Sequence, residues 1–360
     1  MLSYIFRRLL YGFFVLFGVV TLVFFLFNIL PGDPARMMLG QRADAESVNI
    51  INRDLGRDKP ILSQYLNYLN DLSPISVHNN NDPNHYFYLD PDKYVSHNTL
   101  FKVGNASVVI KVPYLRRSYQ TKRPVNEIII AAFPQTAVLA LFSMTFALVC
   151  GVALGIVSAL FKDTWVDRFS LFISTLGMSL PSFFAAILIA WFFAYVLADV
   201  THLNMFGNLY TVDDYGCGEY MDFKNIILPA FTLGIRPLAT LTQLTKNSML
   251  EALSQDYVRT ARAKGLSYQR VLITHALRNA LNPVVTSVSG WLASLLAGAV
   301  FVEYVFDWKG MGIVIVDGLE KYDFPVVMGT ILFICLLLVV INILTDILYG
   351  ILDPRVRVQG

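Results

Sequence analysis

Charged residues are scarce in this sequence. Asp, Glu, Lys and Arg make up 15% of the 360 residues, whereas hydrophobic residues make up 55%. Soluble domains contain about 25% charged residues on average. Several apolar runs exceed the roughly 18 residues that a helix needs to cross a bilayer. The shortage of charge therefore argues against an ordinary soluble domain and predicts a membrane protein with several spans.

Motifs for nucleotide binding and metal chemistry are also missing. The sequence has no Gly-Lys pair, and so no phosphate-binding loop of the Gly-x-x-x-x-Gly-Lys-Ser/Thr type. It has no His-Glu-x-x-His motif either. His78, His85 and His97 share one stretch, but their spacing matches no zinc pattern. We expect no catalytic residue, no metal site and no cofactor bound by this chain.

Cysteine is rare as well. Cys150 and Cys335 lie in apolar runs and Cys217 lies in a polar stretch, without the spacing of a metal site or a disulfide framework. These residues are expected to act as small hydrophobic side chains.

Six apolar segments are predicted to span the membrane, which gives an all-α polytopic membrane protein. They lie at about Leu9–Leu30, Ile128–Leu160, Leu171–Ala198, Ile226–Leu244, Leu281–Phe306 and Val326–Leu348. The first resembles a signal peptide, but it is longer than a signal core and no cleavage site follows, so we expect it to be retained. Pro134 is expected to bend the second span, Pro181 lies inside the third, and Arg236 and Pro237 interrupt the fourth.

The short loops differ in charge. Basic residues gather in the segments that would share one side: Arg7, Arg8, Lys162, Arg168, Lys246, Arg259, Arg262, Lys264, Arg270, Arg278, Arg355 and Arg357. The opposite loops, near Asp199–Lys224 and Asp307–Asp323, are richer in Asp and Glu. The positive-inside rule therefore predicts that both termini are cytoplasmic.

These spans divide the chain into four parts. Residues 1–30 form the first transmembrane helix and residues 31–127 a large extracytoplasmic loop. Residues 128–350 form a core of five helices with a cytoplasmic loop at 246–280, and residues 351–360 form a cytoplasmic tail. Alternating residues in Lys102–Leu115 predict one or two strands, so we expect the loop to form a small α+β cap. A disordered insertion is the alternative.

The cytoplasmic loop contains a basic, helix-prone segment, Gln255–Pro283. Helical spacing predicts one apolar face, made of Leu250, Leu253, Tyr257 and Ala261. Gly265 is expected to end this helix, and Ser267 to cap a second one. Such a hairpin is typical of contact with anionic lipid. It is equally typical of docking to a protein, so both interpretations stay open on these grounds.

The text "QDYVRTARAKGL" at Gln255–Leu266 resembles the cytoplasmic signature of importer permeases of ATP-binding-cassette transporters, in the form found in oligopeptide and dipeptide permeases. In the general signature, Arg259, Thr260 and Ala261 stand at the Glu-Ala-Ala places and Gly265 at the glycine. The Glu is therefore replaced, as are the later Ile and Pro, at His275 and Arg278.

Four further segments resemble sequences of this subfamily. They are Leu30–Pro34, Gln64–Leu69, Glu303–Gly312 and Asn342–Arg357, and Lys309 occupies a position where proline is usual. The resemblance covers nearly the whole chain except about Ser73–Lys122.

The resemblance implies one half of the pore of a peptide uptake transporter in a bacterial cytoplasmic membrane. It implies a second homologous permease subunit, two ATP-binding subunits that hold ATP and Mg, a substrate-binding protein outside and no nucleic acid. It also implies that this chain is not an enzyme. The residues expected to couple to the ATP-binding subunits are Asp256, Tyr257, Arg259, Thr260, Ala261, Ala263, Lys264, Gly265 and Leu266.

Three charged residues fall in or near apolar runs, where a charge is costly. Glu303 and Asp346 lie near the ends of predicted spans, which favours snorkelling or structural pairing over a place on a translocation path. Arg236 is the residue most suited to a translocation path, although it could equally point to the cytoplasmic interface. Gly151 and Gly155 form a Gly-x-x-x-Gly motif, which lets helices approach closely.

Other functions fit the same composition. Within the family, the alternatives are permeases for nickel, glutathione or another small solute. An ion-coupled secondary transporter is a different class, disfavoured because we find no convincing inverted repeat and no acidic residue near a span centre. A membrane enzyme would need a catalytic constellation that the sequence lacks.

Overall fold

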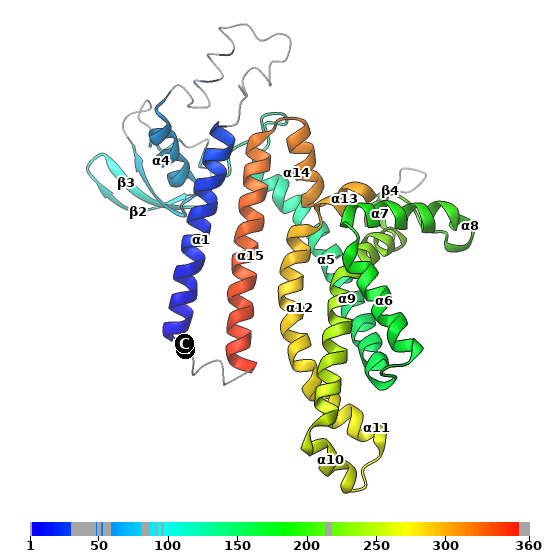
Figure 1. The fold of residues 1–360 in the computed structure, drawn as a ribbon. Helices are drawn as coiled ribbons and strands as arrows, with labels where there is room; N and C mark the ends of the chain where they lie inside the picture. The colour runs from blue at the N-terminus through cyan, green and yellow to red at the C-terminus, as the bar shows by residue number, and fades with distance from the viewer. Residues whose placement is uncertain are drawn as a thin grey trace. The chain divides into compact units, whose positions relative to one another are not determined.

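The computed structural model (Figure 1) describes residues 2–29, 48, 52, 59–80, 87–90, 93–94, 97–212 and 218–352. The chain divides into two compact units. One contains Met1–Gly12, Ala132–Ile313 and Leu336–Gly360, and the other contains Phe13–Ala131 and Val314–Cys335. Predictions about Leu30–Pro34, His85, Cys217, Arg355 and Arg357 lie outside the described residues.

Three helices are long and apolar enough to cross a bilayer. They are α1 (Leu2–Ile29), α5 (Val125–Leu160) and α15 (Phe324–Leu352), which match the first, second and sixth predicted spans. α5 continues through Pro134 as one helix. Two bent pairs of helices raise the number among the described residues to five if each pair counts as one span. The predicted total of six is therefore not reached by length and composition.

The third predicted span is not one helix. The chain forms α6 (Trp165–Ser179) and α7 (Ser182–Trp191), which meet at an angle of 113°. Leu180 between them is extended, at φ −79° and ψ 135°. Pro181 disfavours the helical conformation of the residue before it and has no N–H for the helix ladder, so it ends α6 instead of kinking it. A π-helical turn at Phe192–Val196 and α8 (Ala198–Thr201) follow α7.

Helix α9 (Lys224–Ser254) corresponds to the fourth predicted span. Its 31 residues include Arg236, Lys246 and several Thr, Gln and Asn residues, and it is too polar to count as a span by composition. It packs on α6, α7, α10, α12 and α13. Gly151 and Gly155 of α5 meet α9 closely: an added Cβ would lie 3.0 Å from the Leu238 carbonyl oxygen and 2.7 Å from that of Thr242. The predicted role of this glycine pair is confirmed.

The fifth predicted span begins earlier than expected. Helical turns run without interruption through α11 (Tyr268–Arg270), a π-helical segment η3 (Val271–Leu277) and α12 (Arg278–Gly298). The second short helix of the cytoplasmic loop is therefore the start of this long helix. α13 (Val300–Phe306) then bends away by 57°, and α14 (Met311–Glu320) follows.

The loop between α1 and α5 contains ordered structure. α4 (Ile61–Leu72) precedes β1 (Ile75–Asn79), β2 (His97–Val103) and β3 (Ala106–Lys111), which form an antiparallel sheet in the order β1-β3-β2. The prediction of one or two strands within Lys102–Leu115 is confirmed by β3, and β2 ends there at Val103. A two-stranded hairpin, β4 (Tyr210–Val212) with β5 (Glu219–Met221), lies elsewhere in the chain.

The three-stranded sheet turns its apolar side outward. Pairing places Ile75 opposite Ile110 and Phe101 opposite Val108 on one side. The exposed apolar residues on that side, here called the exposed sheet face, are Ile75, Val77, Phe101, Ile110 and the following Val112. Each is 44–59% exposed. Large apolar side chains that gather on a surface mark a contact site more often than scattered ones do.

The other side of the sheet is buried and mostly polar, with Val109 as an apolar member. Asp71 of α4 is 2% exposed, and its carboxylate accepts hydrogen bonds from Lys93 Nζ at 2.8 and 3.0 Å and from the Tyr94 hydroxyl. Lys111 Nζ donates to the Asp71 carbonyl oxygen at 2.6 Å. His78 is 1% exposed and its Nε2 lies 2.9 Å from the Ser76 hydroxyl. Polar pairing therefore holds this part of the loop together.

This polar core makes the loop sensitive to acid. Burial, and then the nearby Lys111, lower the pKa of His78 from 6.5 to about 4, while Asp71 opposes this shift and Lys93 adds to it. Between pH 6.5 and 4, the unfolded state binds a proton that the folded state does not. The contribution of neutral His78 is thus complete above pH 6.5 and is lost as the pH falls toward 4.

We expect hydrogen exchange in β1–β3, corrected for its intrinsic pH dependence, to show opening that is easier by about 2 kcal/mol at pH 5 than at pH 7. His78→Gln should flatten that slope, because glutamine does not titrate. An equal slope in both proteins would contradict the assignment to His78.

Candidate functional site

The candidate coupling segment begins with a break in the chain. Gln255 is extended, at φ −73° and ψ 150°, between α9 and α10 (Asp256–Ala263). One extended residue resets the helical phase, so sequence spacing across it no longer predicts which residues share a face. The prediction that Tyr257 lies on the apolar face with Leu253 is therefore wrong. Val258 and Ala261 form that face and are buried against Val271, with Leu253 and Leu266 beside them.

Gly265 ends α10 as predicted. Its φ is +77°, a left-handed conformation that glycine adopts without steric cost. Its N–H donates to the Arg262 carbonyl oxygen at 2.9 Å, and the N–H of Leu266 donates to the Ala261 carbonyl oxygen at 3.4 Å. This pair of bonds is the Schellman motif, which commonly brings an apolar contact between Leu266 and the last turns. Ser267 stands at the N-cap position of α11, but its side chain makes no capping hydrogen bond.

Most predicted coupling residues face outward. The exposed ones are Asp256, Tyr257, Arg259, Thr260, Ala263, Lys264 and Gly265. Leu266 is half-buried, and Ala261 is buried against this chain's own helices. Tyr257 is 40% exposed and is a large apolar group among cations. Val258 was not among the predicted residues, although its spacing of three from Ala261 could have revealed the inner face.

A buried ion pair supports the base of this segment. Lys246 Nζ of α9 lies 2.6 Å from Asp167 Oδ1 of α6, and their side chains are 12% and 5% exposed. The Ser158 hydroxyl and the Asp163 N–H also donate to the Asp167 carboxylate, at 2.5 and 3.1 Å. Removing one partner of a buried pair leaves an uncompensated charge. This cluster therefore fixes α9 to α6 and to the end of α5.

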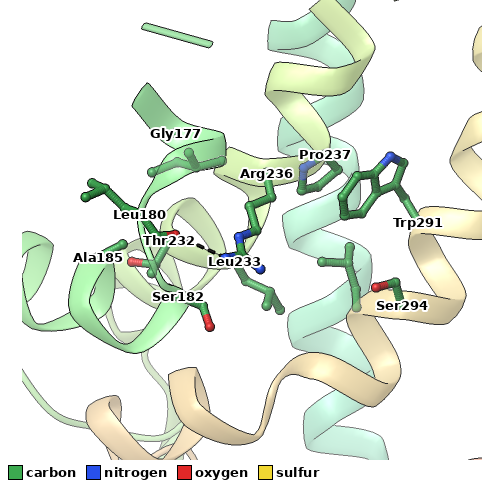
Figure 2. Close-up of a pocket in the computed structure, with 12 residues that line it drawn as sticks. Gly177, Leu180, Ser182, Ala185, Thr232, Leu233, Arg236, Pro237, Trp291 and Ser294 are labelled. Carbon is green, nitrogen blue, oxygen red and sulfur yellow. Dashed lines mark hydrogen bonds between the residues drawn. The ribbon is translucent and has the colours of Figure 1, made fainter. Parts of the chain in front are cut away.

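Arg236 lines a cavity of about 80 Å³ between α6, α7, α9 and α12 (Figure 2). Its Nη2 donates to the Leu180 carbonyl oxygen at 3.1 Å, in the break between α6 and α7. Ser182, Trp291 and Ser294 lie on the other walls of the cavity. The same break that ends the third predicted span thus supplies a hydrogen-bond partner for Arg236.

Glu303 has a structural environment. Its side chain is fully buried and accepts hydrogen bonds from the Thr136 hydroxyl at 2.7 Å and the Gly312 N–H at 2.6 Å. The Thr136 hydroxyl oxygen in turn accepts from the Met311 N–H at 2.8 Å. Both side chains thus satisfy backbone donors in the first turn of α14, which have no partners within the helix. Asp346 pairs with Arg8, 3.1 Å apart, whereas Glu303 is held by neutral hydrogen-bond donors.

Known membrane transport proteins resemble this chain along its whole length. A family model described as the inner membrane component of binding-protein-dependent transport systems matches residues 151–358, and one for the N-terminal part of such components matches residues 1–82. The di/tripeptide transport system permease protein of Pseudomonas aeruginosa is 35% identical over 373 residues, covering 100% of both chains. The glutathione transport system permease protein of Pectobacterium atrosepticum is 34% identical over 357 residues, covering 99% of both.

A solved structure of a methionine ABC transporter in inward-facing conformations has a similar fold. Its TM-score is 0.51 at 15% sequence identity, over 63% of this chain and 97% of that chain.

We expect Glu303→Gln to lower the free energy of unfolding by about 1–3 kcal/mol, since a buried donor that loses its partner costs that much. Glutamine keeps the shape but offers one oxygen in place of two, so either Thr136 or Gly312 loses its acceptor. Thermal unfolding in detergent is the measurement, with Glu320→Gln on the exposed end of α14 as the control. Equal melting temperatures for both variants would contradict the role given to Glu303.

Proposed function

The chain belongs to the family of inner membrane components of binding-protein-dependent transport systems, and from this we propose that it forms half of the translocation path of an ATP-driven importer of short peptides. The observation that carries the proposal is similarity along the whole chain to a di/tripeptide permease. The glutathione permease is similar to nearly the same degree. Glutathione is itself a tripeptide, so both relatives support short peptides as the substrate class.

Two ATP-binding subunits would supply the energy, with ATP and Mg held by them. α10 suits docking to such a subunit because it is short, lies at the end of α9 and leaves Tyr257 uncovered. The surrounding Arg259 and Lys264 favour an acidic partner surface. Contact of the same residues with lipid head groups is the competing interpretation, and it predicts no dependence of ATPase binding on Tyr257.

Movement of α10 would reach two long helices. The backbone joins it to α9 at Gln255, while Val258 and Ala261 pack on Val271 at the base of α12. The Schellman motif at Gly265 fixes the backbone conformation between α10 and the helix that follows, so α10 moves little relative to that helix. From α9, the pair of Lys246 and Asp167 carries displacement to α6. In this mechanism a docked ATPase moves three helices around the cavity at Arg236 together.

On the opposite side of the membrane, the exposed sheet face would meet the substrate-binding protein. The family depends on such a protein, which delivers substrate from outside. The loop is expected to be extracytoplasmic, and its sheet presents Ile75, Val77, Phe101 and Ile110 uncovered. A second permease subunit would complete the path, and both termini would be cytoplasmic.

Purified chain in liposomes should take up no dipeptide, whereas chain assembled with its partner permease, ATP-binding subunits and binding protein should take it up when ATP is inside. In that complex, Tyr257→Ala should lower uptake about tenfold, because a central aromatic side chain often contributes strongly to an interface. Uptake by the chain alone, driven by an ion gradient, would favour a secondary transporter.

The matched control for Tyr257→Ala is Tyr220→Ala, which removes a tyrosine that is 50% exposed on β5. Co-purification of the ATP-binding subunits separates docking from folding. If Tyr257→Ala retains them fully and transports normally, α10 does not couple through this residue.

Phe101→Asp should weaken the interaction with the binding protein about tenfold while the ATP-binding subunits stay bound, because it places a charge on the exposed sheet face. Asn105→Asp adds the same charge at the exposed turn between β2 and β3 and serves as the control. Titration of binding protein against ATPase activity measures the effect. If Phe101→Asp and wild type need the same concentration of binding protein to stimulate ATPase activity, the binding protein does not contact the exposed sheet face at Phe101.

A further inference from the structure

We propose that Arg236 binds the terminal carboxylate of the transported peptide, which makes the cavity at the break between α6 and α7 a recognition site for one end of the substrate. This inference rests on the proposed function, since it names the chemical group that the path would recognise.

Two cations on α9, Lys246 and Arg236, differ in their partners. Lys246 has a carboxylate, Asp167, at 2.6 Å. Arg8 of α1 likewise lies 3.1 Å from Asp346. Within the part of the chain that the structure describes, no carboxylate pairs with Arg236. Arg236 is exposed in the single chain, beside the apolar walls of the cavity, and a cation placed there without an acid of its own is a candidate for binding a mobile anion.

Among the described residues, the Arg236 side chain has one hydrogen-bond partner. A guanidinium has five N–H groups arranged in a fixed plane. One of them meets the Leu180 carbonyl oxygen at 3.1 Å, which holds the head group at the cavity. The remaining donors suit a planar anion with two oxygens, and a carboxylate binds guanidinium through two parallel hydrogen bonds.

The walls of the cavity match the end of a peptide. Leu233, Pro237, Trp291 and Leu295 supply apolar surface, and Ser182 and Ser294 supply hydroxyl groups. The cavity measures about 80 Å³, whereas sites that enclose a whole drug-sized ligand occupy about 300–1,000 Å³. It therefore has room for an end group and not for a complete tripeptide.

A terminal carboxylate is also what the relatives' substrates share. Linear dipeptides and tripeptides end in one, and glutathione has two. Recognition of the terminal carboxylate does not depend on the side chains of the peptide, so one site can accept peptides of different sequence. The amino terminus of a peptide is cationic and would be repelled by Arg236.

The test compares two substrates in the complete transporter. Uptake of a free-acid dipeptide and of its C-terminal amide is measured for wild type and Arg236→Gln in proteoliposomes with the same binding protein. We expect Arg236→Gln to lower uptake of the acid about tenfold, as for loss of a charged hydrogen bond, and to leave uptake of the amide unchanged. The ratio of acid uptake to amide uptake is taken for wild type and for Arg236→Gln. Because both proteins use the same binding protein, its preference for acid or amide cancels when one ratio is divided by the other.

Two control variants accompany this comparison. Arg236→Lys keeps the charge and should retain part of the preference for the acid, whereas Arg168→Gln removes an exposed arginine from α6 and should change neither substrate. Where the binding protein rejects the amide, equilibrium binding of both peptides to the detergent-purified complex, without binding protein, repeats the measurement.

Equal losses for acid and amide in Arg236→Gln would overturn the inference and give Arg236 a structural role, such as pairing with an acid of the second permease subunit. That result does not contradict the proposed function in peptide transport. A wild-type complex that takes up neither peptide would instead overturn the proposed function and this inference with it.

Discussion

Backbone groups in apolar surroundings need hydrogen-bond partners from within the protein, because water does not reach them. Each break in a helix exposes such groups, and this chain supplies side chains at its breaks. Arg236 binds the Leu180 carbonyl oxygen where α6 ends, and Glu303 with Thr136 accepts the first N–H groups of α14. Irregular backbone is thus held in defined positions, which is what a path for a polar substrate requires.

The same constraint separates two uses of charge on α9. Lys246 is neutralised by Asp167 and contributes to rigidity, since the Ser158 hydroxyl and the Asp163 N–H also fix that carboxylate. Arg236 has only a neutral partner in the described part of the chain and keeps its positive charge available. One helix therefore joins the attachment at Lys246 to a charge that lines the cavity. If both proposals hold, α9 links the coupling segment to the substrate site.

Some of this could be predicted from sequence and some could not. Long apolar runs indicated α1, α5 and α15, and Gly265 marked the end of α10, because these features depend on local composition. The break at Pro181 and the extended Gln255 depend on single residues whose effect is decided by neighbouring helices. The partners of Glu303 could not be foreseen, since Thr136 lies 167 residues earlier in the chain. Whether Tyr257 and its neighbours dock to an ATPase remains a prediction.

The sheet between α1 and α5 has its polar side inside and its apolar side outside. This arrangement has a consequence for biogenesis. If the binding protein covers the exposed sheet face as proposed, a subunit without that partner displays it, and exposed apolar patches promote aggregation and are bound by chaperones. Synthesis in excess over the partner proteins would then lead to degradation of the surplus, so that the level of this subunit follows the level of its complex.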